Sequence, residues 1–327
     1  MTSFLLRRLM HSLMILFFVS IIGFIIMQLP PGDFLTVRMA ELEAAGNPMA
    51  GEQIEYLRTR YGLEQPAVVQ YYLWISNFVR GDLGTSFQHR RPVTSLIGTR
   101  LFLTVVVAVS TMAFTWIVGI PIGIYSAIHK NSFLDHVITV IGFLGLSIPN
   151  FLLALVFLVV NVIVLGQSPG GLFSPQYREA AWSLGRAFDL MKHLWVPVVV
   201  IGTAGTAGII RIMRANLLDV LRFQYVQTAR SKGLSENRVI YKHAVRNAIH
   251  PLIMHLGMSF PQIISGGAIV AIVLNLPTIG PLYLTALQQQ DMFLAGSILM
   301  ILVILLIVGN LVADIMLALV DPRIRFE

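Results

Sequence analysis

Long stretches without a charged residue constrain this chain more than any other feature of its sequence. No Asp, Glu, Lys or Arg occurs in residues 101–128, 137–177 or 247–290. A helix crosses a bilayer with about 20 apolar residues, so these stretches are longer than a core helix of a soluble domain needs. Charged residues make up 12% of the chain, about half of the roughly 25% found in soluble domains. The sequence therefore predicts an all-α polytopic membrane protein.

The first apolar run follows Arg7 and Arg8 and extends from Leu9 to Leu29. The apolar part of a signal peptide has only about 7–15 residues and ends at a cleavage site between small residues. This run is longer, and Pro30 follows it directly. We expect an uncleaved first transmembrane helix.

Six apolar segments are long enough to span a bilayer, and Lys and Arg set their orientation, because these residues favour short cytoplasmic loops. With the N-terminus inside, the cytoplasmic segments hold thirteen of them and the two short external loops hold three. The prediction is an N-in, C-in chain, and the net charge of +7 reflects this orientation and not nucleic-acid binding. The expected spans are residues 9–29, 101–128, 137–165, 193–217, 251–274 and 293–319.

Two polar stretches divide the chain. Residues 1–29 are expected to form the cytoplasmic N-terminus and first span, and residues 30–100 an external, periplasmic region with helical patterns near 54–61 and 68–79. Residues 101–327 form the expected permease core, which contains the most charged segment of the chain, residues 218–250, on the cytoplasmic side.

No catalytic motif is visible. The chain has no cysteine, which excludes thiolate metal sites and a cysteine nucleophile. None of its four lysines precedes Ser or Thr, as the lysine of a phosphate-binding P-loop must. HExxH and GxSxG are also absent. We expect a protein that is not an enzyme and holds no cofactor or metal of its own.

The cytoplasmic segment 218–250 reads as two short helices joined by a turn. Gly233 permits the positive φ that ends a helix, Ser235 is a candidate cap for the next one, and Pro251 suits the first turn of the following membrane helix. The second helix is expected to be two-sided. Its basic stripe comprises Arg238, Lys242 and Arg246, and its apolar stripe comprises Ile240, Ala244 and Ala248.

This segment resembles the EAA loop of binding-protein-dependent ABC importers, in which Glu-Ala-Ala is followed, after three residues, by Gly. Residues 227–229 (Gln-Thr-Ala) take the place of the triplet, and Gly233 has the required spacing. The phrases TARSKGL and HAVRNAIHP are similar to the variant of dipeptide/oligopeptide (and nickel) permeases, in their B-type membrane subunit. Two positions depart from the motif, since Gln227 replaces Glu and His250 replaces the Leu before the closing proline.

Further stretches similar to signatures of that family occur in order along the chain. One alone is a weak indication, and together they are specific. They are Met27–Asp33, Tyr61–Pro66, Gly81–Ser86, Arg91–Val93, Gly119–Gly123, Leu276–Gly280 and Asp321–Arg325.

The resemblance implies a type I ABC importer permease fold in the bacterial cytoplasmic (inner) membrane. It implies a heterodimer with a second, C-type permease, two cytoplasmic ATPases that bind ATP and Mg²⁺, and an external substrate-binding protein. The EAA helices would sit in a groove of the ATPase and transmit its closure to the membrane helices. Carried over, the coupling residues are Tyr225, Gln227, Thr228, Ala229, Arg230, Lys232, Gly233, Leu234, Arg246, Asn247 and Pro251.

Four residues inside the spans carry weaker signals. Gly202, Gly205 and Gly208 recur every three residues, which is typical of close helix packing, with pathway lining as the alternative. Asp314 is a carboxylate within the sixth span, where insertion costs at least about 2.5 kcal/mol, so it is a candidate for coupling, for pairing with a basic residue, or for the cytoplasmic interface.

Several alternatives stay open at the level of sequence. Within the family the solute is expected to be a di- or oligopeptide, with nickel complexes, oligosaccharides or opine-like conjugates as alternatives. From other classes, an ion-coupled secondary transporter needs buried ion sites and often repeats, a channel needs a selectivity ring, and a membrane hydrolase needs a catalytic set. None of these features is visible.

Overall fold

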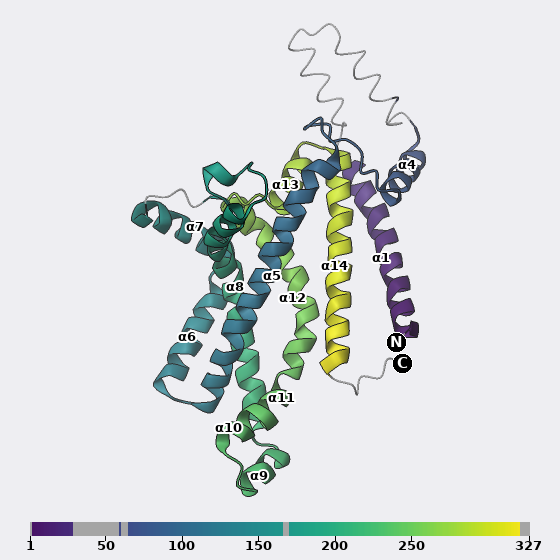
Figure 1. The fold of residues 1–327 in the computed structure, drawn as a ribbon. Coiled ribbons are helices and arrows are strands. Elements are labelled where there is room, and N and C mark those ends of the chain that lie inside the picture. Colours follow the sequence, from purple (N-terminus) through teal and green to yellow (C-terminus); the bar gives the residue numbers. More distant parts are fainter. Residues whose placement is uncertain (1, 29–58, 60–64, 166–169, 321–327) are drawn as a thin grey trace. The chain divides into compact units, whose positions relative to one another are not determined.

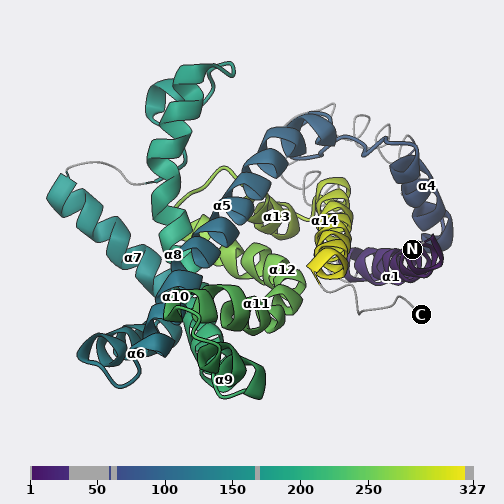
Figure 2. The same ribbon diagram turned by 60° about the horizontal axis from the view of Figure 1, so that its bottom comes forward.

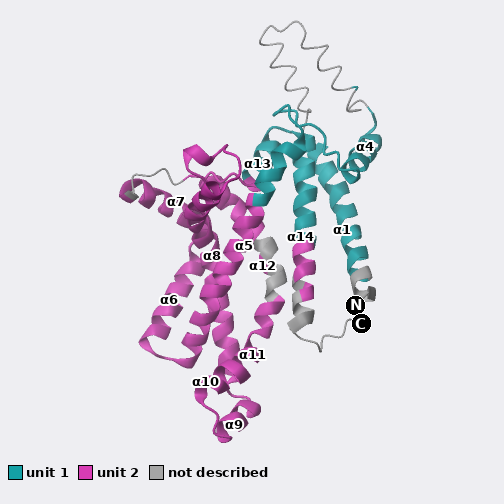
Figure 3. Cartoon of the chain, viewed as in Figure 1, with its two compact units in different colours: residues 1–102, 281–307 teal, residues 103–280, 308–327 magenta. Residues whose placement is uncertain are grey.

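The computed structural model describes residues 2–28, 59, 65–165 and 170–320 (Figure 1). Within these residues the chain is helical, and the pairing of Thr85 with Pro92 is an isolated bridge. The chain forms two compact units (Figure 3). Unit 1 comprises residues 1–102 and 281–307, and unit 2 comprises residues 103–280 and 308–327.

Within the described residues, four helices are long and apolar enough to cross a membrane. A bilayer core offers no partner for free backbone groups, so an unbroken helix is the simplest crossing element. The helix α12 (His250–Val273) follows where the fifth span is expected. The four long helices are α1 (Thr2–Gln28), α5 (Val93–Ile128), α8 (Leu184–Val220) and α14 (Met292–Val320).

The expected third span, residues 137–165, is broken in the structure. Helix α6 (Phe133–Ser147) and helix α7 (Asn150–Val160), which continues into a π-helical turn to Leu165, meet at a bend of 101°. Ile148 between them is extended, with ψ 121°. Pro149 explains the break, because proline lacks an amide donor and pushes the residue before it out of the helical region.

Unit 1 is held together by aromatic packing and one buried acid. The short helix α4 (Ala67–Val79) places Trp74 against Phe24 of α1, and Ser20 Oγ lies 2.8 Å from the Tyr71 hydroxyl. Most of helix α13 (Ile279–Gln288) also belongs to this unit.

The buried acid is Asp291, at the start of α14. Its Oδ2 accepts hydrogen bonds from Ser86 Oγ (2.6 Å) and the Gln88 amide (3.2 Å), and its Oδ1 accepts one from the Leu294 amide (3.2 Å). The carboxylate thus fastens the loop before α5 to the last long helix.

In the described part of unit 2, two apolar cores lie along the same helices. The first joins α5, α7, α8 and α12 through side chains such as Leu103, Ala154, Val200 and Val270. The second gathers the ends of α5 and α8 around the segment between α8 and α12. That segment comprises α9 (Gln224–Ser231), α10 (Glu236–Arg238), the π-helical turn Val239–Ala244 and α11 (Val245–Ala248).

Part of what the sequence predicts lies outside the described residues. This holds for the signature Asp321–Arg325, for almost all of the helical pattern near 54–61, and for most of Met27–Asp33 and Tyr61–Pro66. The helical pattern at 68–79 is confirmed as α4.

Replacing Asp291 should weaken unit 1. Asp291→Ala leaves the Ser86 hydroxyl and two backbone amides without their charged acceptor. Because hydrogen bonds to charged groups each contribute about 1.5–3 kcal/mol, we expect the free energy of unfolding to fall by at least that much and the thermal midpoint of the purified protein in detergent to drop. Gln88→Ala is the matched control, since it keeps the backbone amide that Asp291 binds. Equal midpoints for the two variants would contradict the assignment.

Candidate functional site

The segment between α8 and α12 lies at the end of unit 2 that the charge pattern assigns to the cytoplasm (Figures 1 and 2). Helix α9 ends at Ser231, and Gly233, two residues later, has a φ of +76°, as the sequence predicts. Pro251 stands in the first turn of α12, also as predicted. The expected cap is wrong in its detail: Ser235 occupies the capping position, but its side chain makes no capping bond. Its carbonyl oxygen instead accepts from the Arg238 amide at 2.8 Å.

One side of this coupling segment (residues 221–250) is buried. Val226 and Ala229 of α9 pack in the same core as Met213 and Leu217 of α8. The predicted apolar stripe is confirmed, because Ile240, Ala244 and Ala248 are all buried. Burial of an aliphatic side chain stabilises by about 1.5–3 kcal/mol, so the segment is held firmly to the helix ends.

Two expectations about this segment need correction. Ala229, expected on the docking surface, is only 7% exposed and faces the core, since it lies three residues after Val226 on the inward side of α9. The second helix is not a regular α-helix, because Val239–Ala244 forms a π-helical turn. The wider turn still leaves Arg238, Lys242 and Arg246 exposed along the segment.

The outer side carries polar and basic groups. Gln227, Thr228 and Lys232 are exposed, and Gln227 Nε2 donates to the Leu221 carbonyl at 3.0 Å. Asn247 Nδ2 donates to the Tyr225 hydroxyl at 2.7 Å, which ties α11 to α9.

A salt bridge crosses the turn of the coupling segment. Arg230 Nη2 lies 2.5 Å from Glu236 Oε1, and this hydrogen bond lowers the pKa of Glu236. Stability from the pair is therefore present above the usual pKa of Glu and is lost as the pH falls through the lowered value. Both side chains are more than one-third exposed, so solvent limits the gain to below about 1 kcal/mol.

A buried ion pair lies next to this segment, where α6 meets α8. The carboxylate of Asp135, which is 2% exposed, accepts from Arg214 Nε at 2.9 Å and from Arg214 Nη2 at 2.8 Å. It also accepts from Ser126 Oγ at the end of α5 and from the Asn131 amide at 2.9 Å in the turn between α5 and α6. One carboxylate thus joins three helices.

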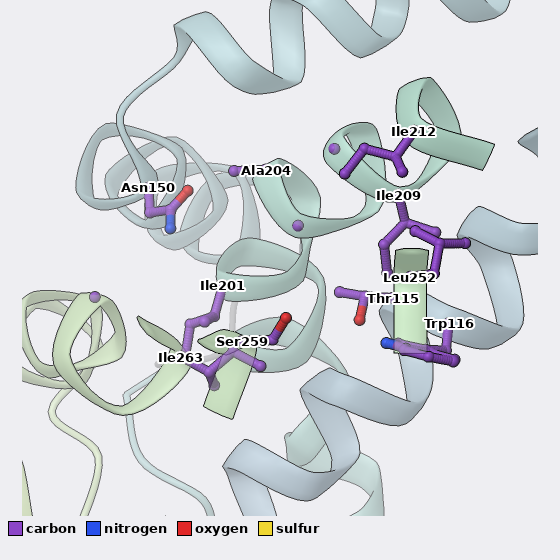
Figure 4. Close-up of a pocket in the computed structure, with 13 residues that line it drawn as sticks. Thr115, Trp116, Asn150, Ile201, Ala204, Ile209, Ile212, Leu252, Ser259 and Ile263 are labelled. Carbon is purple, nitrogen blue, oxygen red and sulfur yellow. The ribbon is translucent and has the colours of Figure 1, made fainter. Parts of the chain in front are cut away.

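A cavity of about 290 Å³ opens among α5, α7, α8 and α12 (Figure 4). Among the described residues its polar lining consists of Thr115, Trp116, Asn150 and Ser259, and none of these described lining residues is charged. The remaining lining is Ile201, Ala204, Gly205, Gly208, Ile209, Ile212, Leu252, Ile263 and Gly266.

The three spaced glycines of α8 differ in what surrounds them. A Cβ added to Gly202 would lie 2.9 Å from Phe114 Cδ1, so this glycine permits close packing against α5. Gly208 has open space around such an atom and lines the cavity. Gly205 does both, since its added Cβ would lie 3.2 Å from Thr115 Cγ2 and it also lines the cavity.

Some residues of this region were not singled out from the sequence. Asp135 lies just before one apolar run and Arg214 near the end of another. This position beside charge-free segments was the sequence signal that could have pointed to them. Asn150 follows Pro149, which is a visible helix breaker. Asp314 is half-buried in the last helix, and its role stays a prediction.

The sequence matches two family models that together cover nearly the whole chain. Residues 119–326 match the model "Binding-protein-dependent transport system inner membrane component", and residues 1–108 match the model of the N-terminal part of such membrane components. The chain belongs to this family: it is a multi-pass membrane permease subunit of a binding-protein-dependent ABC importer.

Full-length relatives agree with this class. The chain is 37% identical to the oligopeptide transport system permease protein AppB of Bacillus subtilis over 100% of both chains. It is 32% identical to OppB, the oligopeptide permease protein of Haemophilus influenzae, and 32% identical to the glutathione transport permease protein GsiC of Escherichia coli, again over 100% of each chain. The fold also matches a chain of the inward-facing MetNI methionine ABC transporter, with a TM-score of 0.56, 16% identity, and coverage of 70% of this chain and 97% of that one.

The two outer glycines of α8 should respond oppositely to alanine. Gly202→Ala drives a methyl group into the Phe114 ring, and overpacking of this kind costs about 1–3 kcal/mol. Gly208→Ala meets open space, and removing a helical glycine stabilises by about 0.5–1 kcal/mol. We expect the thermal midpoint in detergent to fall for the first variant and to rise for the second.

Gly208→Leu separates packing from pathway lining. This variant should keep the folded yield while it narrows the cavity and lowers solute uptake into proteoliposomes. Unchanged uptake would mean that the cavity is not on the transport route.

Proposed function

We propose that this chain is the B-type permease of a bacterial inner-membrane importer for di- or oligopeptides. In this proposal it pairs with a second, C-type permease and forms half of the translocation pathway. An external binding protein delivers the solute, and two cytoplasmic ATPases bind ATP and Mg²⁺ and hydrolyse the nucleotide. The full-length likeness to permeases named for oligopeptide and glutathione transport supports a peptide solute.

The coupling segment carries the proposal for ATPase docking. A docking element must keep its shape under load while it presents a surface to the partner. Here Val226, Ala229 and Ala244 are buried against the helix ends, while Gln227, Thr228 and Lys232 are exposed. Together with Tyr225, Arg230, Gly233, Leu234, Arg246, Asn247 and Pro251, the exposed residues Gln227, Thr228 and Lys232 form the proposed coupling site.

The cavity suits a pathway for solutes of varied charge. Peptides differ in side-chain charge, and a charged wall would bind some of them tightly and repel others. The cavity is lined by apolar side chains, small residues and a few uncharged polar groups, which supports low selectivity in the membrane. Nickel complexes, oligosaccharides and opine-like conjugates stay as alternative solutes.

The test is ATPase activity and peptide uptake by the complex in lipid, with the second permease and both ATPases co-expressed. We expect the loaded binding protein to raise ATP turnover. Gly233→Ala should lower the affinity for the ATPases by about tenfold, because a side chain in the left-handed region costs roughly 1–2 kcal/mol. Gly233→Asn is the matched control, since asparagine tolerates this conformation and should retain most of the affinity.

The opposite outcome is equally clear. If the chain purifies without ATPases and moves solute along an ion gradient, the importer proposal fails. An ion-coupled secondary transporter then takes its place.

A further inference from the structure

The Asp135–Arg214 pair differs in kind from the other ion pair near the coupling segment. The Arg230 and Glu236 side chains are both more than one-third exposed, whereas the Asp135 side chain is 3% exposed. A buried carboxylate is costly unless its partners are complete. Asp135 has complete partners, since the Arg214 guanidinium binds it through two nitrogens and Ser126 and Asn131 also donate to it.

Arg214 lies on the stretch of α8 that touches both candidate functional regions. Ile212, two residues earlier, lines the cavity. Met213 and Leu217 belong to the core that holds the coupling segment. Asn216 Nδ2 lies 3.4 Å from the Ala248 carbonyl oxygen at the end of that segment. These contacts join the coupling segment to α8 at the turn that carries Arg214.

Helix α6 lacks a place in that core, since the core's buried members come from α5, α8, the coupling segment and α12. At its far end, α6 approaches α8 through Gly145, where an added Cβ would lie 3.0 Å from Thr203 Cγ2. At its near end the ion pair provides the connection. Just beyond Gly145 the helix is interrupted at Pro149, and Asn150, the first residue of α7, lines the cavity.

From this arrangement we infer that Asp135 is a positioning residue for transport: it locks α6 to α8 so that both move as one body with the coupling segment. The break at Ile148–Pro149 is then the point where this movement changes the cavity wall at Asn150. The inference rests on the proposed function and adds a route by which ATPase closure reaches the solute. The route consists of the contacts between the coupling segment, α8 and α6, which act as a rigid body, and of the hinge at Ile148–Pro149.

The first test compares transport with ATP turnover in the reconstituted complex. In Asp135→Asn and Arg214→Gln the ATPases should still co-purify, because the outer side of the coupling segment is unchanged. Binding-protein-stimulated ATP hydrolysis should persist, while peptide taken up per ATP falls by about tenfold, since the lost bonds are charge-assisted and bidentate. Arg211→Gln, an exposed cation one turn earlier on α8, is the matched control and should keep the wild-type ratio.

The second test restores the lock by other means and also covers variants that fold poorly. The chain has no cysteine, and a Cβ added at Gly145 lies 3.7 Å from Ala207 Cβ, within the usual 3.5–4.5 Å for a disulfide. Gly145→Cys with Ala207→Cys should cross-link α6 to α8 without loss of uptake in the otherwise wild-type chain. In Asp135→Asn the cross-link should restore uptake per ATP, and a reducing agent should remove that rescue.

Three outcomes would overturn the inference. In the first, uptake per ATP is unchanged in Asp135→Asn. In the second, uptake and ATP turnover fall in parallel with the thermal midpoint, and the cross-link gives no rescue. In the third, the cross-link alone abolishes uptake, which would mean that α6 and α8 must move apart. Failure of the wild-type complex to couple ATP to uptake would instead refute the proposed function.

Discussion

The burial of one side of the coupling segment against the ends of α5 and α8 is the interaction on which the rest of unit 2 depends. Short helices in water are marginal by themselves, and α9 has eight residues. Its shape comes from packing, with Val226 and Ala244 completely buried. Because the same core contains Met213 of α8 and Ile124 of α5, the segment is joined to two long helices directly, without a flexible connection.

The fold could be predicted well from sequence because a bilayer permits few solutions. Charge-free runs must be helices, and local markers such as Gly233 and Pro251 act through their own backbone. Proline at position 149 is itself a local signal for the helix break. Hydropathy alone does not reveal the break, because the apolar run continues on both sides of this residue. The ion pair could not be predicted, since Asp135 and Arg214 are 79 residues apart and only helix packing brings them together. The inward position of Ala229 likewise depends on which side of α9 the helix ends cover.

Helix α8 packs closely against α5 at some positions and borders the cavity at others. At Gly119 and Gly123 of α5 an added Cβ would lie 2.8 Å from Ile209 and Met213 side chains, so the two helices touch almost backbone to backbone there. One face of α8 is thus committed to α5, and the face with Gly208 is left free. The placement of glycines thus lets one helix pack closely against α5 on one face and line the cavity on another.

The bend between α6 and α7 also has a consequence for the bilayer thickness that this flank of the permease matches. Helix α6 has 15 residues and is about 22 Å long at 1.5 Å per residue, whereas the hydrocarbon layer is about 30 Å thick. Helix α7 is bent by 101° from α6. If α6 lies along the bilayer normal, α7 therefore adds almost nothing to the length that spans the bilayer. The exposed side chains of α7, such as Val156 and Val159, then lie within the hydrocarbon layer. In that orientation the hydrophobic length of this flank is shorter than the hydrocarbon layer, a mismatch that a thinner bilayer relieves and a thicker one increases.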